Sequence, residues 1–463
     1  MFSNEQLKEI EEMGISICKD TFRVKYFSPN KFASYIARIF PLIYNNEEFY
    51  KYRTGKWSKI NEAYVLKRLR DMLHKYHDDI WCLKYEKEYV AALKRIILYE
   101  GDLNNYKRYI NLLNGMYDLE TFTLVEHSKE FYSTIQIPIE YDENAECPEF
   151  MNFLNQCFLG DEESKSLGQE WAGYLMTAET KAQKALILYG LGGNGKGVFI
   201  DAISYLIGQE NISSIPLNEL HKGFSRVCLH NKLANISNEN ECNGSSLNTQ
   251  YFKAITGEDV ITAEQKNKPV FEFRPTVKLC FSTNNLPHTK DTSYGFIRRL
   301  SILHFKNTVK EENRDGDLKE KLKEEAQGIF LWAVEGLRRL NDNKFKFSEC
   351  SVSNSVIDQY QKEINPIVLF FEECISVTED SYREDRRTIY NSFRAWAEAN
   401  GMDGYAKIST QRFWKKFQEQ IKVLNYNCTL GRSNTFRYCT GVKVVGDFRI
   451  DVNNPVLKGR LGG

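Results

Sequence analysis

A glycine-rich stretch near the middle of the chain has the spacing of a loop that binds phosphate. It reads Gly190-Leu191-Gly192-Gly193-Asn194-Gly195-Lys196, after the apolar run 185–189 and before apolar residues at helical spacing. Glycines let backbone N–H groups turn toward phosphate oxygens, and the first turn of a helix adds a favourable dipole. A chance glycine-rich turn is the alternative, but the strand–loop–helix context and the lysine favour a nucleotide site. We expect this site to contain Gly190, Gly192, Gly193, Asn194, Gly195, Lys196, Gly197 and Val198.

The residue after the lysine departs from the phosphate-loop pattern GxxxxGK[ST], which places a hydroxyl there to hold Mg²⁺. This chain has Gly197 instead. Either the site holds its metal in another way, or the loop is decayed or accidental. Because Mg²⁺ keeps several waters and binds mostly through substrate phosphates, the loss of one ligand need not abolish binding. We therefore predict a working but weak ATPase that uses ATP and Mg²⁺.

Two polar clusters follow other apolar runs and offer further groups that ATP hydrolysis requires. Asn238 and Glu239 follow the run 233–236. Glu239 could polarise the attacking water, and Asn238 stands where a carboxylate often supports Mg²⁺. Asn284 follows the run 277–281, and its amide could contact the γ-phosphate and position the water. When Asn238 and Glu239 are considered without the other motifs, a polar strand end without a catalytic role is a serious alternative.

Basic residues occur at two further places. Arg298 and Arg299 come just before the run 300–305. Adjacent arginines are usually a solvated pair, but in a ring of subunits one of them could reach the ATP of the neighbour. We therefore keep both as candidates for an arginine finger.

The runs 260–264 and 270–273 flank a turn that carries Lys266 and Lys268, which predicts a β-hairpin with two lysines at its tip. A lysine contacts phosphate without reading base sequence, as a motor that moves along DNA requires. The alternative role of these lysines is solubility alone.

The elements that would position these residues can be located from apolar runs and periodicity. The four runs 185–189, 233–236, 277–281 and 300–305 are separated by helical or loop segments. Such spacing predicts an α/β fold with a mainly parallel sheet and helices on its faces. The region before the sheet mixes helices with short strands, and two helices are expected just before the first run.

A second unit is expected beyond a softer boundary at 345–355. The segments 365–375, 388–401 and 409–421 show helical periodicity, and a hairpin that turns near 431–434 follows them. Three helices and a basic hairpin make a winged helix, whose third helix can enter the major groove. We expect DNA contacts from the third helix, although such modules also dock proteins. The expected contacts are Arg412, Lys415 and Lys416.

Composition limits the remaining possibilities. The chain has 463 residues, and 62 Lys and Arg residues balance 62 Asp and Glu residues, so any basic surface must be local. The eleven cysteines are scattered and form no CxxC pair, which favours reduced thiols over a structural zinc site. No secretory signal opens the chain, and no apolar run approaches the roughly 20 residues that span a bilayer. We expect an intracellular protein with no membrane partner.

The order of these motifs, within about 120 residues, resembles the helicase region of phage and plasmid primase-helicases. These are superfamily 3 helicases, as are the poxvirus primase-helicases. The stretches "INLLNGMYDLETFTLVEHS" and "ECPEFMNFLNQCF" resemble the region that precedes the helicase in that family. The resemblance implies a mixed α+β N-terminal domain (1–145), an AAA+-type P-loop ATPase core (146–345) and a C-terminal winged-helix domain (350–463).

Carried over by residue, the resemblance assigns a role to each candidate. Lys196 would bind phosphate, Asn238 and Glu239 would form the acidic pair, Asn284 would be the sensor, and Arg298 or Arg299 would be the finger. Lys266 and Lys268 would grip DNA in the central channel. The implied protein is a homo-oligomeric, hexameric DNA helicase in the cytoplasm of a bacterial host, acting on single-stranded and forked DNA.

Three points stay open in this interpretation. No primase catalytic site is recognisable before the helicase, so a separate primase or polymerase is an expected partner. A replication initiator or loader that binds ATP and DNA with little hydrolysis is the first alternative, supported by Gly197 and Asn238. A small-molecule phosphotransferase is the second, but it would explain neither the lysine-tipped hairpin nor the arginine pair.

Overall fold

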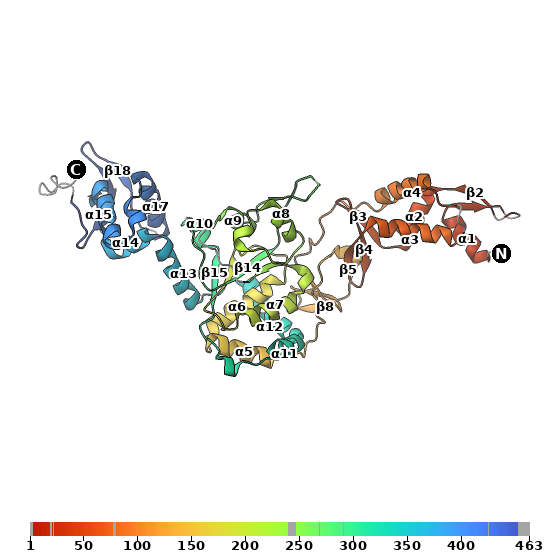
Figure 1. The fold of residues 1–463 in the computed structure, drawn as a ribbon, viewed down its shortest axis with the longest axis horizontal. Helices are drawn as coiled ribbons and strands as arrows, with labels where there is room; N and C mark the ends of the chain where they lie inside the picture. Colours follow the sequence, from red (N-terminus) through yellow and green to blue (C-terminus); the bar gives the residue numbers. More distant parts are fainter. Residues whose placement is uncertain are drawn as a thin grey trace.

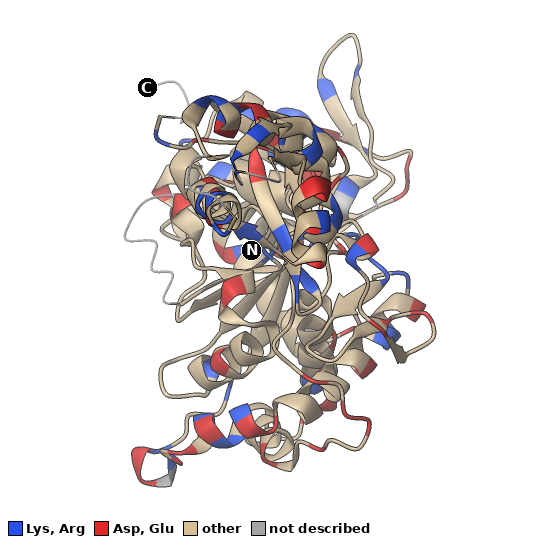
Figure 2. Ribbon diagram, turned by 90° about the vertical axis from the view of Figure 1, so that its right-hand side faces the viewer, with Lys and Arg blue, Asp and Glu red and all other residues tan. Residues whose placement is uncertain are grey.

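The computed structural model describes residues 3–18, 21, 23–76, 80–238, 247–267, 269–289, 291–424 and 426–451. Their buried apolar side chains form separate cores, which define an N-terminal body (10–97), a central body (110–364) and a C-terminal body (367–444). The three bodies lie in a row, with the central body in the middle (Figure 1). Basic and acidic residues are interspersed along the ribbon (Figure 2). In the described part of the chain, no helix is both long and apolar enough to span a membrane.

Five parallel strands form the central sheet, in the order β10-β11-β14-β9-β15. Their bounds are β9 Ala185–Tyr189, β10 Ile212–Ser213, β11 Ala234–Ser237, β14 Lys278–Thr283 and β15 Leu300–His304. All four predicted apolar runs are strands, because a strand covered on both faces is apolar along its length. The predicted parallel sheet is therefore confirmed. The edge strand β10 is too short to be recognised in the sequence.

Alternate side chains of β9 pack into different cores. Leu186 and Leu188 share a core with α5, α6, α7 and α12, whereas Ala185 and Ile187 share a core with α9 and α13. The helix bounds are α5 Pro148–Phe158, α6 Glu162–Leu175, α7 Lys196–Ile207, α9 Gln250–Thr256, α12 Ala326–Asp342 and α13 Ser351–Ile364. Shorter elements are α8 Gly223–Arg226, β12 Ile261–Ala263, β13 Phe271–Phe273, α10 Tyr294–Ile297 and α11 Leu318–Glu324. Helices thus cover both faces of the sheet, and α5 and α6 are the two helices expected before it.

The N-terminal body mixes helices with short strands, as predicted. Its elements are α1 Asn4–Glu12, β1 Ile15–Ile17, β2 Val24–Phe27, α2 Pro29–Ile39, β3 Leu42–Asn45, β4 Glu48–Arg53, β5 Lys56–Ile60, α3 Glu62–His74 and α4 Leu83–Ile96. A meander of β6 Tyr109–Asn111, β7 Met116–Asp118 and β8 Thr123–Val125 follows. Ile110 and Tyr117 of this meander pack into the core of the central body.

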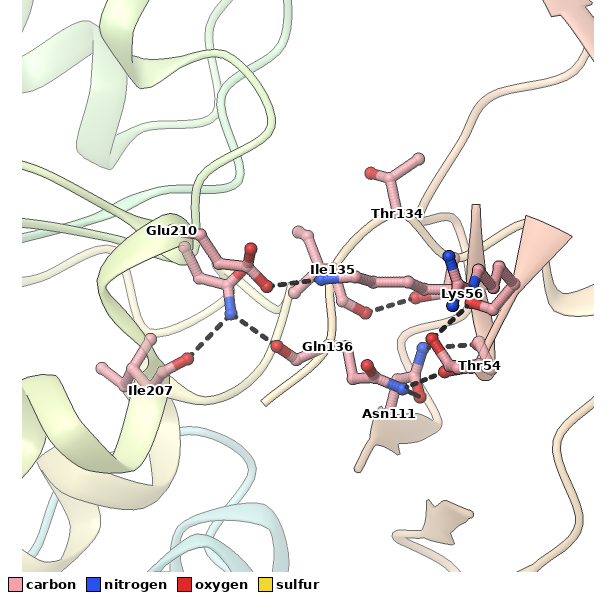
Figure 3. Close-up of polar contacts among 12 residues, drawn as sticks. Thr54, Lys56, Asn111, Thr134, Ile135, Gln136, Ile207 and Glu210 are labelled. Carbon is pink, nitrogen blue, oxygen red and sulfur yellow. Dashed lines mark hydrogen bonds and ion pairs between the residues drawn. The ribbon is translucent and has the colours of Figure 1, made fainter. Parts of the chain in front are cut away.

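A polar junction joins the β4–β5 turn to the end of α7 (Figure 3). Gln136 lies between them: its Nε2 donates to Thr54 O (2.9 Å), and its carbonyl O accepts from Asn211 Nδ2 (2.9 Å). The Lys56 ammonium pairs with Glu210 at 2.5 Å. Because α7 begins at the glycine-rich loop, this junction fixes the N-terminal body to the helix that leaves the loop.

The C-terminal body contains the three predicted helices and the predicted hairpin. Its elements are α14 Pro366–Cys374, β16 Ile375–Val377, β17 Arg383–Asp385, α15 Arg386–Ala399, α16 Asp403–Ala406, α17 Thr410–Val423, β18 Leu430–Arg432, β19 Arg437–Thr440 and β20 Val442–Val444. The hairpin β18–β19 is extended by β17, and β16 pairs with β20. Strands β16, β17 and β20 have three residues each, too few to show an alternating pattern.

Candidate functional site

The glycine-rich loop connects the carboxyl end of β9 to the first turn of α7. Gly195 precedes the helix with φ 93°, and Gly193 has φ 75°. A Cβ at Gly195 would lie 2.5 Å from Cys157 Sγ on α5, so the loop packs too closely on α5 for a larger residue. The buried Asn194 side chain donates to Phe305 O (3.0 Å) and fixes the loop to the end of β15.

Lys196 is almost fully buried at the centre of this loop. Its Nζ donates to the carbonyl oxygens of Gly190 and Leu191, and to the amide oxygens of Asn194 (3.1 Å) and Asn284 (3.1 Å). Burial lowers the pKa of Lys196. All four of these partners are neutral, so they solvate the ammonium without balancing its charge. A bound anion would supply that charge.

Sheet order explains why Asn284 meets the lysine. Strand β14 lies directly beside β9, with Thr283 opposite Tyr189, so the residue after β14 reaches the mouth of the loop. The structure therefore brings together the predicted phosphate lysine and the predicted sensor amide, and Asn284 is exposed there to a ligand.

Asn238, the first residue of the predicted acidic pair, lies at the same sheet edge but one strand further away. Asn238 follows β11 directly and is exposed. Strand β14 separates β11 from β9, which places the two strand ends about 10 Å apart. Glu239 lies outside the described residues, so its contact with metal or water stays a prediction.

The arginine pair lies at the opposite edge of the sheet. Leu300, the residue after Arg299, is opposite Ala185 at the amino end of β9. Since β15 has five residues, about 16 Å of strand separates this edge from the glycine-rich loop. Neither arginine therefore reaches the loop of its own chain.

Both arginines are half-buried against their own body. Arg298 donates to Gln183 Oε1 (3.1 Å), and Arg299 donates to Gly295 O. Burial, reinforced by the charge of Arg298, lowers the pKa of Arg299. Within the described residues, Nε of Arg299 is buried without a hydrogen-bond partner.

The predicted hairpin is present: β12 and β13 pair antiparallel, with Ile261 opposite Phe273. Its base is anchored to the central body, because Arg226 of α8 donates to Thr262 O (2.7 Å) and the His230 ring packs on Phe273 (5.0 Å between centroids). Lys266 is exposed in the turn, and Lys268 lies outside the described residues.

The structure corrects the expectation for one residue of α17. Arg412 and Lys415 are exposed. Lys416 is 8% exposed and donates to Thr292 Oγ1 of the central body (2.8 Å). Burial lowers its pKa to about 8. Consecutive residues of a helix point in different directions, and this one faces the central body, so it is not at a surface that DNA could contact.

The structure also places a residue at the loop that sequence analysis missed. Val309 N donates to Gly193 O (3.0 Å), and Arg314 Nε donates to Val309 O (3.3 Å). A Cβ at Gly193 would lie 2.7 Å from Arg314 Nη2, so this guanidinium lies directly against the loop. Nothing in the charged stretch around Arg314 predicts this position, because the approach depends on how the chain continues after β15.

Two family models match parts of the chain. Residues 31–159 match a family described as D5 N terminal like. Residues 188–299 match a family of unknown function, DUF5906. The second match includes the glycine-rich loop, the lysine hairpin and the arginine pair.

Two curated viral proteins are similar over most of the chain. One is named "Putative helicase 184R" (Invertebrate iridescent virus 6) and is 24% identical over 390 residues, 74% of this chain and 39% of that protein. The other is named "Putative helicase L207/L206" (Acanthamoeba polyphaga mimivirus) and is 22% identical over 386 residues, 77% of this chain and 39% of that protein. The chain thus spans about two fifths of the length of these relatives.

Two solved apo structures of the NrS-1 C-terminal region share the fold. Their TM-scores are 0.50 and 0.51 at 13% identity, and they cover 89% and 88% of this chain and 98% and 97% of their own. The D5 N-terminal-like match, the helicase-named relatives and this shared fold confirm the resemblance to the primase-helicase family.

Proposed function

We propose that the chain is an ATP-dependent DNA helicase that acts in replication of a phage, plasmid or other mobile element. The observation that carries the proposal is Lys196, a buried ammonium at the mouth of the glycine-rich loop whose hydrogen-bond partners among the described residues are all neutral oxygens. The phosphates of ATP would provide the opposite charge. The helicase names of both viral relatives favour DNA unwinding over other phosphate chemistry.

In this proposal the glycine-rich loop is the P-loop of an AAA+-type core. Its backbone N–H groups would bind the phosphates, and Asn284 would contact the γ-phosphate. When bound, Mg²⁺ neutralises charge on the phosphates. Asn238 and Glu239 are the side chains that would hold it, partly through water, because Gly197 has no hydroxyl to offer.

The ATP site would be completed by a second copy of the chain. The arginine pair is at the sheet edge away from the loop, and an arginine finger acts on the transferring phosphate at close range. One of the two arginines would therefore serve the ATP of a neighbour in a closed ring, for which we propose six subunits. The bacterial host and its cytoplasm stay predictions of the resemblance.

DNA would be held at two places. The exposed Lys266 would contact the strand in the ring's channel, together with Lys268. The C-terminal body would act as a winged helix that uses Arg412 and Lys415. The expected result for Lys266→Ala is loss of unwinding with ATP binding retained, whereas Lys222→Ala, a surface lysine on the neighbouring part of the chain, should unwind normally.

Phosphate release in the presence of Mg²⁺ and single-stranded DNA tests the proposal. We expect turnover by the wild type that DNA stimulates, and at least a hundredfold loss for Lys196→Ala, since one electrostatic contact in a transition state is worth about 3 kcal/mol or more. A wild type without turnover under these conditions would contradict the motor. If the protein binds DNA but its ATP turnover is slow and is not stimulated by DNA, the initiator or loader is favoured. Gly197 and Asn238 support that alternative.

A further inference from the structure

A hollow of about 420 Å³ lies in the C-terminal body between the first turns of α15 and α17 and the turn of the β18–β19 hairpin. This volume falls in the range of small-ligand clefts, about 300 to 1,000 Å³. The residues that line the hollow include Arg386, Trp414, Arg432, Asn434, Phe436 and Arg437. Apart from Trp414, which lies on α17, this set comes from α15 and the hairpin, so the hollow is distinct from the predicted contacts at Arg412 and Lys415.

Four arginines line this hollow, and the charges of three of them, Arg386, Arg432 and Arg437, repel one another. Arg432 and Arg437 are directly opposite each other in the hairpin register, an arrangement that destabilises a strand pair. The Arg386 guanidinium lies 4.3 Å from the centre of the Trp414 ring. Burial, with the charge of Arg437 adding to it, lowers the pKa of Arg386.

No carboxylate of the described residues balances these charges. Asp385 is the acidic residue of the lining, but its Oδ2 accepts from Arg387 (2.9 Å) and its Oδ1 from Arg387 N (2.8 Å). None of the ion pairs found among the described residues involves Arg386, Arg432 or Arg437. Arg432 and Arg437 are exposed, so solvent screens part of this repulsion, but three guanidiniums around one hollow without a paired carboxylate favour binding of an anion there.

We propose that this hollow binds one nucleotide unit of a DNA single strand. Its phosphate would lie on Arg432 and Arg437, and its base would lie against Phe436 and the guanidinium plane of Arg386. A duplex hides its base faces in the stack, whereas an unpaired nucleotide offers both a phosphate and a flat face. The proposal rests on the proposed function, because it identifies where the C-terminal body holds a strand that the motor has separated.

Fluorescence anisotropy of the full-length chain with labelled oligothymidylate at fixed salt tests this site. For Arg432→Ala/Arg437→Ala we expect affinity to fall about tenfold, the loss typical of one stacked or charged contact. Lys443→Ala removes an exposed lysine of the same body outside the hollow and should change affinity less than about twofold. Without DNA, the double variant should melt at the wild-type temperature or higher, because the opposed charges are gone.

Unchanged affinity of the double variant for the single strand would overturn the site, as would a larger loss of its affinity for a blunt duplex or a phosphoserine peptide than for the single strand. If the wild type binds no single-stranded DNA at all, the result would instead contradict the proposed function. A variant that loses affinity and also melts well below the wild type would contradict the claim that these arginines serve a ligand and not the fold.

Discussion

At the scale of single residues, Gly197 decides how the metal of the proposed ATP site is held. A Cβ built at this position has no atom within 4 Å, and the residue lies in the first turn of α7. A serine would therefore fit without moving a neighbour. Lack of space for a Cβ therefore does not explain the missing hydroxyl.

Replacing this glycine should restore a metal ligand. We expect Gly197→Ser to raise kcat/KM for Mg²⁺–ATP about fivefold, because one added contact is worth about 1 kcal/mol. Gly192→Ser is the matched control, since a Cβ there also meets no atom within 4 Å, yet the phosphate-loop pattern has no metal ligand at that position. Equal effects of the two serines on Mg²⁺-dependent turnover would contradict this account of Gly197.

Arg314 should bind the nucleotide from within its own chain. Its guanidinium lies against Gly193, and a charge-assisted contact to phosphate is worth about 1.5 to 3 kcal/mol. We expect Arg314→Ala to weaken binding of a fluorescent ATP analogue at least about tenfold. Lys310→Ala, on the same segment and highly exposed, should bind normally. Retained affinity in Arg314→Ala would show that the arginine only covers the loop.

At the scale of elements, the segment before α10 links three parts of the molecule. Asp291 accepts from Thr249 Oγ1 at the start of α9 and from Lys253 Nζ within that helix (2.7 Å). It also accepts from Ser293 N (3.0 Å). Thr292 accepts from Lys416 of α17. Arg298 and Arg299 come directly after α10. The segment before α10 therefore sets the position of the arginine pair relative to the C-terminal body.

Asp291 should make stability depend on pH. Burial opposes its ionisation, but the hydrogen bonds from Lys253, Ser293 and Thr249 outweigh burial and lower its pKa to about 2. A carboxyl with a depressed folded pKa stabilises the fold above its unfolded pKa of about 3.9, and that stabilisation is lost as pH falls toward 2. We expect Asp291→Asn to cost about 1 to 2 kcal/mol in urea unfolding at pH 7, and less below pH 4. A difference that is constant from pH 7 to pH 3 would contradict this.

The helices and strands that could be predicted are those whose own residues show, by an apolar pattern, that they are buried. Buried strands such as β9 appear as apolar runs, and the Gly195–Lys196 turn into α7 follows from a known loop pattern. Strands β10, β16 and β17 were missed because two or three residues carry no periodicity. Arg314 and Lys416 were missed or misplaced for another reason: their positions depend on contacts between parts of the chain that are far apart in sequence.

At the scale of the whole molecule, the two halves of the proposed ATP site face away from each other. The lysine loop and Asn284 lie at the carboxyl edge of the sheet, and the arginine pair lies at the amino edge. The junction at Gln136 fixes the N-terminal body to α7, and Lys416 contacts the central body from the other end. In the proposal, each chain would therefore contribute half of an ATP site at each edge of the sheet, and a ring of copies would complete both.

Subunit mixing tests this central claim most directly. The measurement is ATP turnover, with Mg²⁺ and single-stranded DNA, by an equimolar mixture of Lys196→Ala and the double variant Arg298→Lys/Arg299→Lys. Each variant alone should be inactive, because every interface lacks either the phosphate lysine or the planar guanidinium of the finger. In a random equimolar mixture, about one interface in four joins an intact loop of one variant to intact arginines of the other, so the account predicts recovery of up to about a quarter of wild-type turnover. A mixture that co-assembles by mass measurement yet stays inactive would contradict it.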